Sequence, residues 1–173
     1  YWNRLIQPGI VALVGAGGKT TVLSKLVEYG RLQGQPIVVT TTTHLYESQV
    51  AQYEPIYTKD INDVDEYCTK RIQQGYCGAW FSGITRTKVD AVDCESIDGL
   101  SALHPNWQIV VEADGAKEKW LKAPKNTEPV IPSQTKTTIG VVNLQMLGSS
   151  LDEDHVHNLK LVLSIVHREE GAI

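Results

Sequence analysis

The sequence has few cysteines and no long apolar segment. Its three cysteines, Cys68, Cys77 and Cys94, are widely spaced and form no Cys-x-x-Cys pair. This spacing argues against a disulfide framework and fits a reducing compartment, where free cysteines pack as small apolar side chains. No stretch approaches the roughly 20 apolar residues that span a bilayer, and no charged-then-apolar leader opens the chain. We therefore expect a cytoplasmic protein with no membrane partner.

An excess of positive charge is also missing. The formal net charge of −4 argues against a surface that neutralises many nucleic-acid phosphates, so nucleic acid is not an expected partner. With 173 residues, 42% of them hydrophobic, the chain has the length of one packed domain. It begins with Tyr1, and residues 169–173 show no sign of a natural end. We therefore expect one domain over residues 1–173, truncated at its C-terminus.

The first 42 residues carry the pattern of a strand–helix–strand unit. Residues 10–14 are wholly apolar and lie between Pro8-Gly9 and Gly15, which is typical of a buried parallel strand. Residues 19–33 place apolar side chains at helical spacing, and residues 37–42 are a second β-rich run. The connection is long enough for a right-handed crossover, so the pattern favours a parallel sheet.

The rest of the chain continues this α/β pattern. We expect helices over residues 60–74, 96–103 and 159–166, and strands over residues 79–81, 107–112 and 138–143. Residues 117–132 contain three prolines and several lysines, which predicts an irregular or hairpin-like insertion after the third core strand. The expected fold is a three-layer sandwich, similar to phosphate-loop NTPases, with a mostly parallel central sheet.

A glycine-rich loop connects the first strand to the first helix. It reads Gly15-Ala16-Gly17-Gly18-Lys19-Thr20-Thr21 and departs from the usual GxxxxGK[ST] pattern, because Leu13 replaces the first glycine. Glycines allow positive φ and turn backbone N–H groups toward a phosphate, and a helix N-terminus adds its dipole. Lys19 would add a point charge, Thr20 would bind Mg²⁺ and Thr21 would contact an inner phosphate.

Two other interpretations of this loop are weaker. A purely structural strand-to-helix turn has the same composition, although the loop lies where a phosphate loop should, between a buried strand and a helix. A dinucleotide-binding GxGxxG turn would require glycine at position 20, where the chain has Thr20.

Acidic and hydroxyl side chains follow the neighbouring strands. Glu112 and Asp114 end the third apolar strand and share its parity, so both could face a metal. Asp114-Gly115 alone is equally typical of an ordinary turn. Residues 40–43 are all threonines at the end of the second strand, and Thr41 is the candidate metal ligand among them. Threonine also simply favours strands.

A second possible metal site lies near the end of the chain. His155 and His157 follow the acidic residues 152–154 and would share a face if the backbone is extended. A solvated acidic helix start explains the same residues through the helix dipole.

Several motifs in order give the chain a resemblance to a known family. It resembles the selenium-dependent hydroxylase accessory proteins, the YqeC family, over nearly its whole length. The motifs are VALVGAGGKTT from residue 11, TTTTH from residue 40, VVEADGAK from residue 110 with LKAP and EPVIP, and LDEDHVH from residue 151. The resemblance implies a phosphate-loop protein that binds ATP or GTP with Mg²⁺ and assists the maturation of selenium-dependent molybdenum hydroxylases.

The resemblance also assigns residues by motif. It implies that the phosphate and metal loop consists of Gly15, Gly17, Gly18, Lys19 and Thr20, with Glu112 and Asp114 as acidic partners. Lys117, Lys122, Glu128 and His155 fall in matching blocks whose roles it does not define. The chain departs from the family at Trp120, where proline is common, and in a shorter stretch between His157 and His167. A base-reading motif would follow Ile173, so the choice between ATP and GTP stays open.

Our leading hypothesis is an Mg²⁺-dependent NTPase that serves cofactor insertion. Lys19 and Asp114 are the candidate catalytic residues, residues 15–21 bind the nucleotide, and the metal candidates are Thr20, Thr41, Glu112 and Asp114. In this hypothesis, Lys19 stabilises charge on the transferring phosphoryl group. One alternative is an ATP-dependent ligase domain of the Mur type, although 173 residues cannot hold the additional domains of those enzymes. Another is a non-hydrolysing binding scaffold, since the sequence shows no clear general base.

Overall fold

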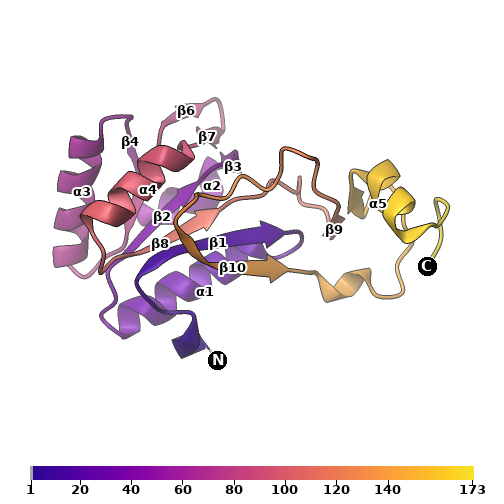
Figure 1. Ribbon diagram of the computed structural model, residues 1–173, viewed down its shortest axis with the longest axis horizontal. Helices are drawn as coiled ribbons and strands as arrows, with labels where there is room; N and C mark the ends of the chain where they lie inside the picture. The colour runs from indigo at the N-terminus through magenta and orange to yellow at the C-terminus, as the bar shows by residue number, and fades with distance from the viewer. Residues whose placement is uncertain (1) are drawn as a thin grey trace.

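A six-stranded parallel sheet forms the centre of the molecule. The computed structural model describes residues 2–173 (Figure 1). The strands lie in the order β10 (Thr135–Val141), β1 (Gly9–Gly15), β8 (Gln108–Glu112), β2 (Ile37–Thr41), β5 (Gly78–Phe81) and β4 (Ile56–Tyr57). Each neighbouring pair is parallel. The predicted α/β class and the mostly parallel sheet are therefore confirmed.

Helices cover both faces of this sheet. Helix α1 (Lys19–Leu32) packs on one face, whereas α3 (Ile61–Gln73) and α4 (Cys94–Leu103) pack on the other. Strand β1 alternates accordingly: Val11 and Leu13 contact the α1 side, and Ile10 and Ala12 contact the α3 and α4 side. Strands buried on both faces are continuously apolar, which is why the sequence marks them clearly. The predicted three-layer arrangement is thus confirmed.

Helix ends follow local capping signals. The carboxylate of Asp60 accepts a hydrogen bond from the backbone N–H of Asn62 and begins α3. Asp93 likewise accepts from the N–H of Ser96, so α4 begins at Cys94, two residues before the predicted start at Ser96. Strand β10 begins at Thr135 and not at the predicted residue 138.

Several short elements were not predicted. Strands β3 (Leu45–Tyr46), β6 (Gly83–Thr85) and β7 (Lys88–Asp90) form a small antiparallel sheet beside helix α2 (Glu47–Val50) and the 3-10 helix η2 (Ala51–Tyr53). A second 3-10 helix, η1 (Trp2–Arg4), precedes β1. Strands of two or three residues are too short to show a hydrophobic period, so the sequence gives little sign of them.

The irregular insertion and the end of the chain form what we call the C-terminal lobe. It comprises β9 (Leu121–Lys122), η3 (Leu144–Met146), β11 (Val156–His157) and α5 (Leu159–Val166). Strand β9 pairs in parallel with β11 and does not fold back as a hairpin. The lobe has a small apolar core of its own, and it extends from one end of the sheet (Figure 1). The predicted helix over residues 159–166 matches α5, but residues 152–155 form a turn before β11 and not the acidic helix start that we considered.

Cys68, Cys77 and Cys94 are free thiols, so the described chain contains no disulfide. None of the helices within residues 2–173 has the length and apolar character needed to cross a membrane.

Candidate nucleotide-binding site

The glycine-rich loop between β1 and α1 requires its glycines. Gly15, Gly17 and Gly18 have φ values of +92°, +70° and +134°. A Cβ atom at Gly15 would overlap the carbonyl oxygen of Val141, and one at Gly17 would overlap the Asn143 side chain. The loop is thus packed against the end of β10, and only glycine fits its path.

Five consecutive amides, in this loop and the first turn of α1, have no acceptor among the described residues. The N–H of Gly15 donates to Asp114 Oδ2 at 3.0 Å, and the N–H of Ala16 donates to the carbonyl oxygen of Val141 at 3.0 Å. Within residues 2–173, in contrast, the N–H groups of residues 17–21 donate to no protein atom, and Gly18 provides no side-chain cap for α1. Uncapped amides at a helix N-terminus form a natural anion site.

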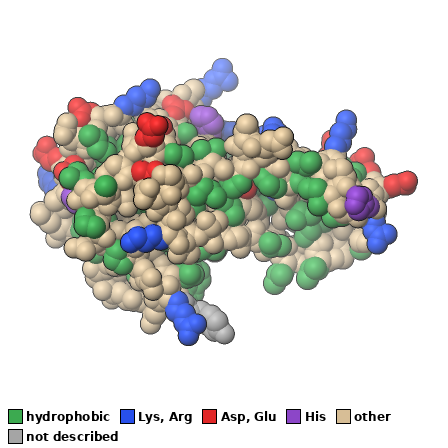
Figure 2. Space-filling model, viewed as in Figure 1, with side chains coloured by type: hydrophobic (Ala, Val, Ile, Leu, Met, Phe, Trp, Pro, Cys, Tyr) green, Lys and Arg blue, Asp and Glu red, His purple; other side chains and the backbone are tan. Residues whose placement is uncertain are grey.

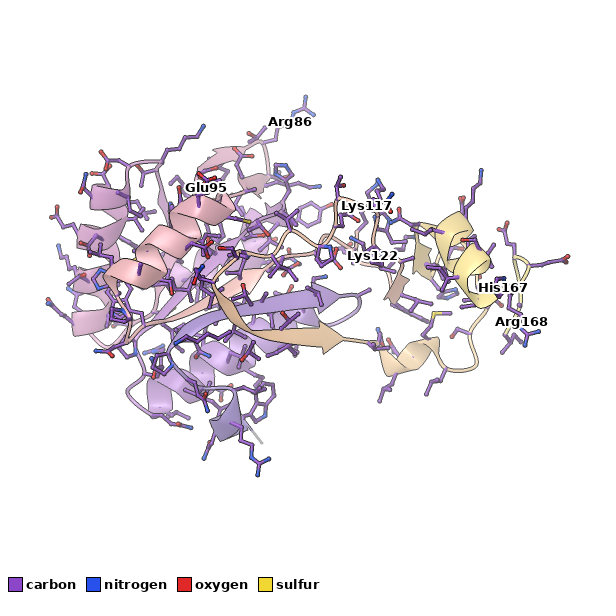
Figure 3. All side chains as sticks on the ribbon, viewed as in Figure 1. Arg86, Glu95, Lys117, Lys122, His167 and Arg168 are labelled. Carbon is purple, nitrogen blue, oxygen red and sulfur yellow. The ribbon has the colours of Figure 1, made fainter. Side chains whose placement is uncertain are left out.

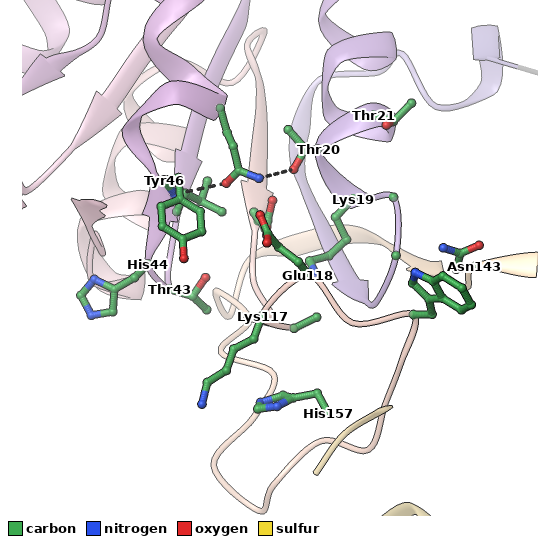
Figure 4. Close-up of a pocket in the computed structure, with 18 of the residues that line it drawn as sticks. Lys19, Thr20, Thr21, Thr43, His44, Tyr46, Lys117, Glu118, Asn143 and His157 are labelled. Carbon is green, nitrogen blue, oxygen red and sulfur yellow. Dashed lines mark hydrogen bonds and ion pairs between the residues drawn. The ribbon is translucent and has the colours of Figure 1, made fainter. Parts of the chain in front are cut away.

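These amides line a cavity beside the start of α1. Its volume is about 630 Å³, within the usual range for small-molecule sites. Figure 4 shows Lys19, Thr20 and Thr21 on one side of this phosphate-loop cavity, with Lys117 and His157 across from them. The lining comprises Gly17, Gly18, Lys19, Thr20, Thr21, Thr43, His44, Leu45, Tyr46, Gln49, Glu112, Gly115, Ala116, Lys117, Glu118, Trp120, Lys125, Glu128, Asn143 and His157.

Lys19 and Glu112 form a buried pair at the back of this cavity. The Lys19 ammonium donates to the Gly15 carbonyl oxygen at 2.8 Å and lies 3.7 Å from Glu112 Oε1. Burial raises the pKa of Glu112 to about 6, against the opposing charge of Lys19. Burial also lowers the pKa of Lys19. Both shifts show that desolvation outweighs the attraction within the pair.

Asp114 holds the loop in place and lies behind the cavity wall. Its Oδ2 accepts the Gly15 N–H, and its Oδ1 pairs with the ammonium of Lys122. Lys122 also pairs with Glu128 at 2.8 Å and donates to the Gly115 carbonyl oxygen at 2.7 Å. The Lys122 side chain is only 1% exposed. Both oxygens of Asp114 are therefore occupied by protein donors.

The four predicted metal ligands occupy different positions. Thr20 and Glu112 line the cavity, and Glu112 Oε2 is buried without a hydrogen-bond partner in the described chain. The hydroxyl of Thr41 lies outside the lining and donates to the Glu112 carbonyl oxygen at 2.8 Å. Asp114 is held by Gly15 and Lys122. The two candidates that line the cavity and carry oxygens suited to a hard cation are thus Thr20 and Glu112.

His155 and His157 do not come together. His155 lies 2.7 Å from Asp152 Oδ1 and packs its ring against Trp120, with ring centres 4.5 Å apart. His157 instead lines the phosphate-loop cavity. In the described chain, no group of three or more His, Cys, Asp or Glu side chains is arranged to hold a metal ion. The structure therefore gives no support to a transition-metal site at these histidines.

The sequence analysis named Lys117 and Glu128 without a role and did not predict the cavity wall opposite the loop to which they belong. Residues 115–118 and Lys125 line it, and Lys117 and Glu118 have positive φ values of +47° and +62°. Residues other than glycine rarely adopt this backbone conformation, and where they do, they often lie at functional sites. Lys117 lies in the stretch that joins the sheet to the C-terminal lobe, and Lys122 lies on β9 of the lobe (Figure 3). Asn143 is a further missed residue, and its position follows from the contact with Gly17, which no local sequence signal reveals.

Comparison with known proteins connects this site to a family. Residues 11–160 match the family described as YqeC protein, a range that contains the loop, the acidic pair and both strands of the lobe. The chain belongs to the YqeC family. The predicted resemblance is thereby confirmed. A relative from Escherichia coli K12, "Uncharacterized protein YqeC", is 30% identical over 152 residues.

The extent of this match differs between the two YqeC chains. The aligned part covers 87% of this chain but 58% of the Escherichia coli relative. No solved structure matches the chain significantly. The match therefore establishes family membership, and any argument about the chemistry of this chain depends on the geometry of the site.

Proposed function

We propose that this YqeC chain is a cytoplasmic accessory protein that binds ATP or GTP with Mg²⁺ and hydrolyses it. The observation that carries the proposal is the row of N–H groups at residues 17–21, which lack acceptors in the part of the chain that the structure describes and border a cavity of about 630 Å³. Several amides that converge at a helix N-terminus favour a polyphosphate over a neutral ligand. Lys19 adds a cation at the same place.

The residues present fit a magnesium ion at this site. Glu112 has a buried oxygen without a hydrogen-bond partner among residues 2–173, and the cavity-lining Thr20 has a hydroxyl contacted at 3.5 Å by the amide of Gln49. Carboxylate and hydroxyl oxygens are the ligands that Mg²⁺ prefers, and the ion would offset the negative charge of the phosphates. Asp114 would act as a positioning residue, because it holds Gly15 and thereby fixes the direction of the loop amides.

Lys19 would stabilise the negative charge that builds up on the transferring phosphoryl group. In the structure its ammonium is held by the Gly15 carbonyl oxygen and Glu112 at the cavity's rear. A bound phosphate and cation would replace these contacts with stronger ones, because a polyphosphate carries more charge than one carboxylate.

The biological role rests on the resemblance alone. We propose that nucleotide hydrolysis serves the maturation of selenium-dependent molybdenum hydroxylases, with such a hydroxylase or its cofactor as the partner. The chain spans 58% of the Escherichia coli relative, so a role that requires the whole length of such a protein is part of this proposal.

Isothermal titration with ATP and with GTP, each with Mg²⁺, tests nucleotide binding. We expect Lys19→Ala to weaken binding about a hundredfold, since a charged phosphate contact in a buried site contributes roughly 2–3 kcal/mol. Lys25→Ala is the matched control: Lys25 lies on the same helix, exposed and paired with Glu28. Equal affinities for wild type and Lys19→Ala would remove the loop from this account, and phosphate release by the wild type would establish turnover.

A further inference from the structure

A second cavity adjoins the phosphate-loop cavity on the side of the C-terminal lobe. Its volume is about 580 Å³. We call it the lysine cavity; it is lined by Lys117, Lys119, Lys125, Glu153, Val156, His157, Asn158, Leu159, Lys160 and Leu161. Lys117, Lys125 and His157 line both cavities, so the two spaces share a border.

The lysine cavity is positively charged in a protein whose net charge is negative. Four lysines line it against the single carboxylate of Glu153 among its described lining residues. Within residues 2–173, neither Lys117, Lys125 nor Lys160 forms an ion pair. Like charges that remain unneutralised around a hollow repel each other, and an anion relieves that repulsion.

The positive charges around the lysine cavity also affect the pKa of His157, which lines both cavities. Its pKa is lowered, first by burial and then by the charges of Lys122 and Lys117. At neutral pH, His157 is therefore an uncharged ring that can donate or accept a hydrogen bond at the border between the cavities.

The wall of the lysine cavity also has an apolar side. Val156 and Leu159 are buried members of the lobe core, and Leu161 is half-buried beside them. A site lined by both lysines and aliphatic side chains matches a ligand that has an anionic part and an apolar part. Several lysines around one space favour phosphate over carboxylate, because a phosphate dianion accepts from more donors.

We propose that the lysine cavity binds the second ligand of this protein, a small organic molecule with an apolar body and at least one phosphate group. This inference rests on the proposed function, because the shared border at Lys117, Lys125 and His157 would place that ligand next to the nucleotide's phosphates. The C-terminal lobe then has a defined role, since β11, the start of α5 and the residues on either side of β9 build the second binding site.

The test uses phenyl phosphate as a probe, titrated into wild-type protein that is saturated with Mg²⁺ and a non-hydrolysable ATP analogue. We expect saturable binding that weakens about tenfold in Lys119→Gln/Lys160→Gln, since two partly exposed charge contacts are lost. The single variant Lys160→Gln, at an exposed position, should show a smaller loss in the same direction. Lys70→Gln is the control, because Lys70 is an exposed lysine on α3, at the opposite end of the molecule from α5 (Figure 1).

Further arms separate the possible outcomes. Inorganic phosphate and benzoate should each bind more weakly than phenyl phosphate, and tighter binding of benzoate would overturn the assignment to phosphate. Equal phenyl phosphate affinities in wild type and the double variant would overturn the site itself, as would a loss of nucleotide affinity in the double variant. If wild type binds no nucleotide, the proposed function fails, and phenyl phosphate titrated into nucleotide-free Lys19→Ala protein still tests the lysine cavity by itself.

Discussion

The two sides of the phosphate-loop cavity are built in different ways. The first, which we call the sheet wall, comprises the loop and the ends of β1 and β8, where Lys19 and Glu112 are each 5% exposed. The second, the lobe wall, comprises residues 115–125 and the C-terminal lobe, and Lys117, Glu118 and Lys125 on it are exposed. Figure 2 shows apolar side chains on the surface at the lobe end, where Leu147 is 80% exposed.

The sheet wall is supported by more buried apolar packing than the lobe wall. The sheet wall is anchored in two large apolar clusters on the faces of the parallel sheet. The lobe has only a small buried cluster, whose members are Ala123, Val156, Leu159 and Val162. Regions with few buried apolar contacts open at lower free energy, so the lobe wall should move before the sheet wall does. A rigid glycine loop that faces a more movable lobe wall fits our proposal that the protein holds nucleotide while it exchanges another ligand.

The largest expected effect comes from breaking the link between the two walls. Lys122, on β9 of the lobe, pairs with Asp114 of the sheet wall and has a side chain that is 1% exposed. Lys122→Met leaves the Asp114 carboxylate buried without its cation, so we expect a loss of about 3–5 kcal/mol in the free energy of unfolding, measured in urea. Lys125→Met, at an exposed position nearby, should change it by no more than about 0.5 kcal/mol.

A double variant identifies the cause of that loss. Lys122→Met combined with Asp114→Asn should recover part of the stability, because no unpaired charge stays buried. A cost below about 1 kcal/mol for Lys122→Met alone would mean that the two walls are not joined by this pair.

The next largest effect tests how tightly the sheet wall is packed. Gly17 and Gly34 both have φ of +70°, but a Cβ at Gly17 would overlap Asn143, whereas nothing lies within 4 Å of one at Gly34. Gly34→Ala should therefore cost about 1 kcal/mol for its backbone conformation alone. Gly17→Ala should cost roughly 1–3 kcal/mol more, for overpacking, and should also weaken nucleotide binding. Equal costs in urea unfolding would show that the loop can shift away from Asn143.

The same contrast explains what the sequence could reveal. The parallel strands and α1 were predictable because burial on both faces produces a continuous apolar run, and the helix produces a 3.6-residue period. The glycine loop was predictable because its residue types are required by local backbone geometry at Gly15, Gly17 and Gly18. The sheet wall thus depends on short-range signals.

The lobe wall depends on pairing between distant segments, so the sequence contains few local signals of it. Strand β9 has two residues and is defined only by its partner β11, more than thirty residues later in the chain. The burial of Lys122 between Asp114 and Glu128 follows from that pairing, and a lysine in a proline-rich stretch otherwise indicates an exposed loop. No local sequence signal showed that Asp114 would pair with Lys122, or that the Thr41 hydroxyl would donate to the Glu112 carbonyl oxygen.

A matched pair of core substitutions compares the two regions directly. Val39 on β2 is fully buried in the sheet core, whereas Val162 on α5 is 4% exposed in the small lobe cluster. Val39→Ala should cost about 2–3 kcal/mol of unfolding free energy, from lost burial and a cavity that cannot collapse. Val162→Ala should cost about 1 kcal/mol, because few neighbours surround it and the lobe can relax. The reverse order would show that the lobe is the more tightly packed region.

The last predicted effect is a pH dependence of stability at the sheet wall. Burial raises the pKa of Glu112 to about 6 from its usual 4.5, so the folded protein binds this proton more tightly than the unfolded chain does. The cost of ionising Glu112 is therefore absent below pH 4.5 and complete above pH 6, where it reaches about 2 kcal/mol. Wild type should lose stability relative to Glu112→Gln as the pH rises through this window, measured by urea unfolding of both proteins.

Adding magnesium and nucleotide tests whether Glu112, the residue behind this pH effect, binds the metal. If Glu112 holds Mg²⁺, saturating Mg²⁺ and a non-hydrolysable ATP analogue favour its ionised form and lower its pKa, so wild type should regain stability above pH 6. Glu112→Gln should gain less from the same additions, because an amide binds Mg²⁺ more weakly than a carboxylate. A pH-independent difference between the two proteins without ligand would show that Glu112 is solvated. Equal gains on adding ligand would show that the metal is held elsewhere, and the buried carboxylate would then serve only to fix the ammonium of Lys19.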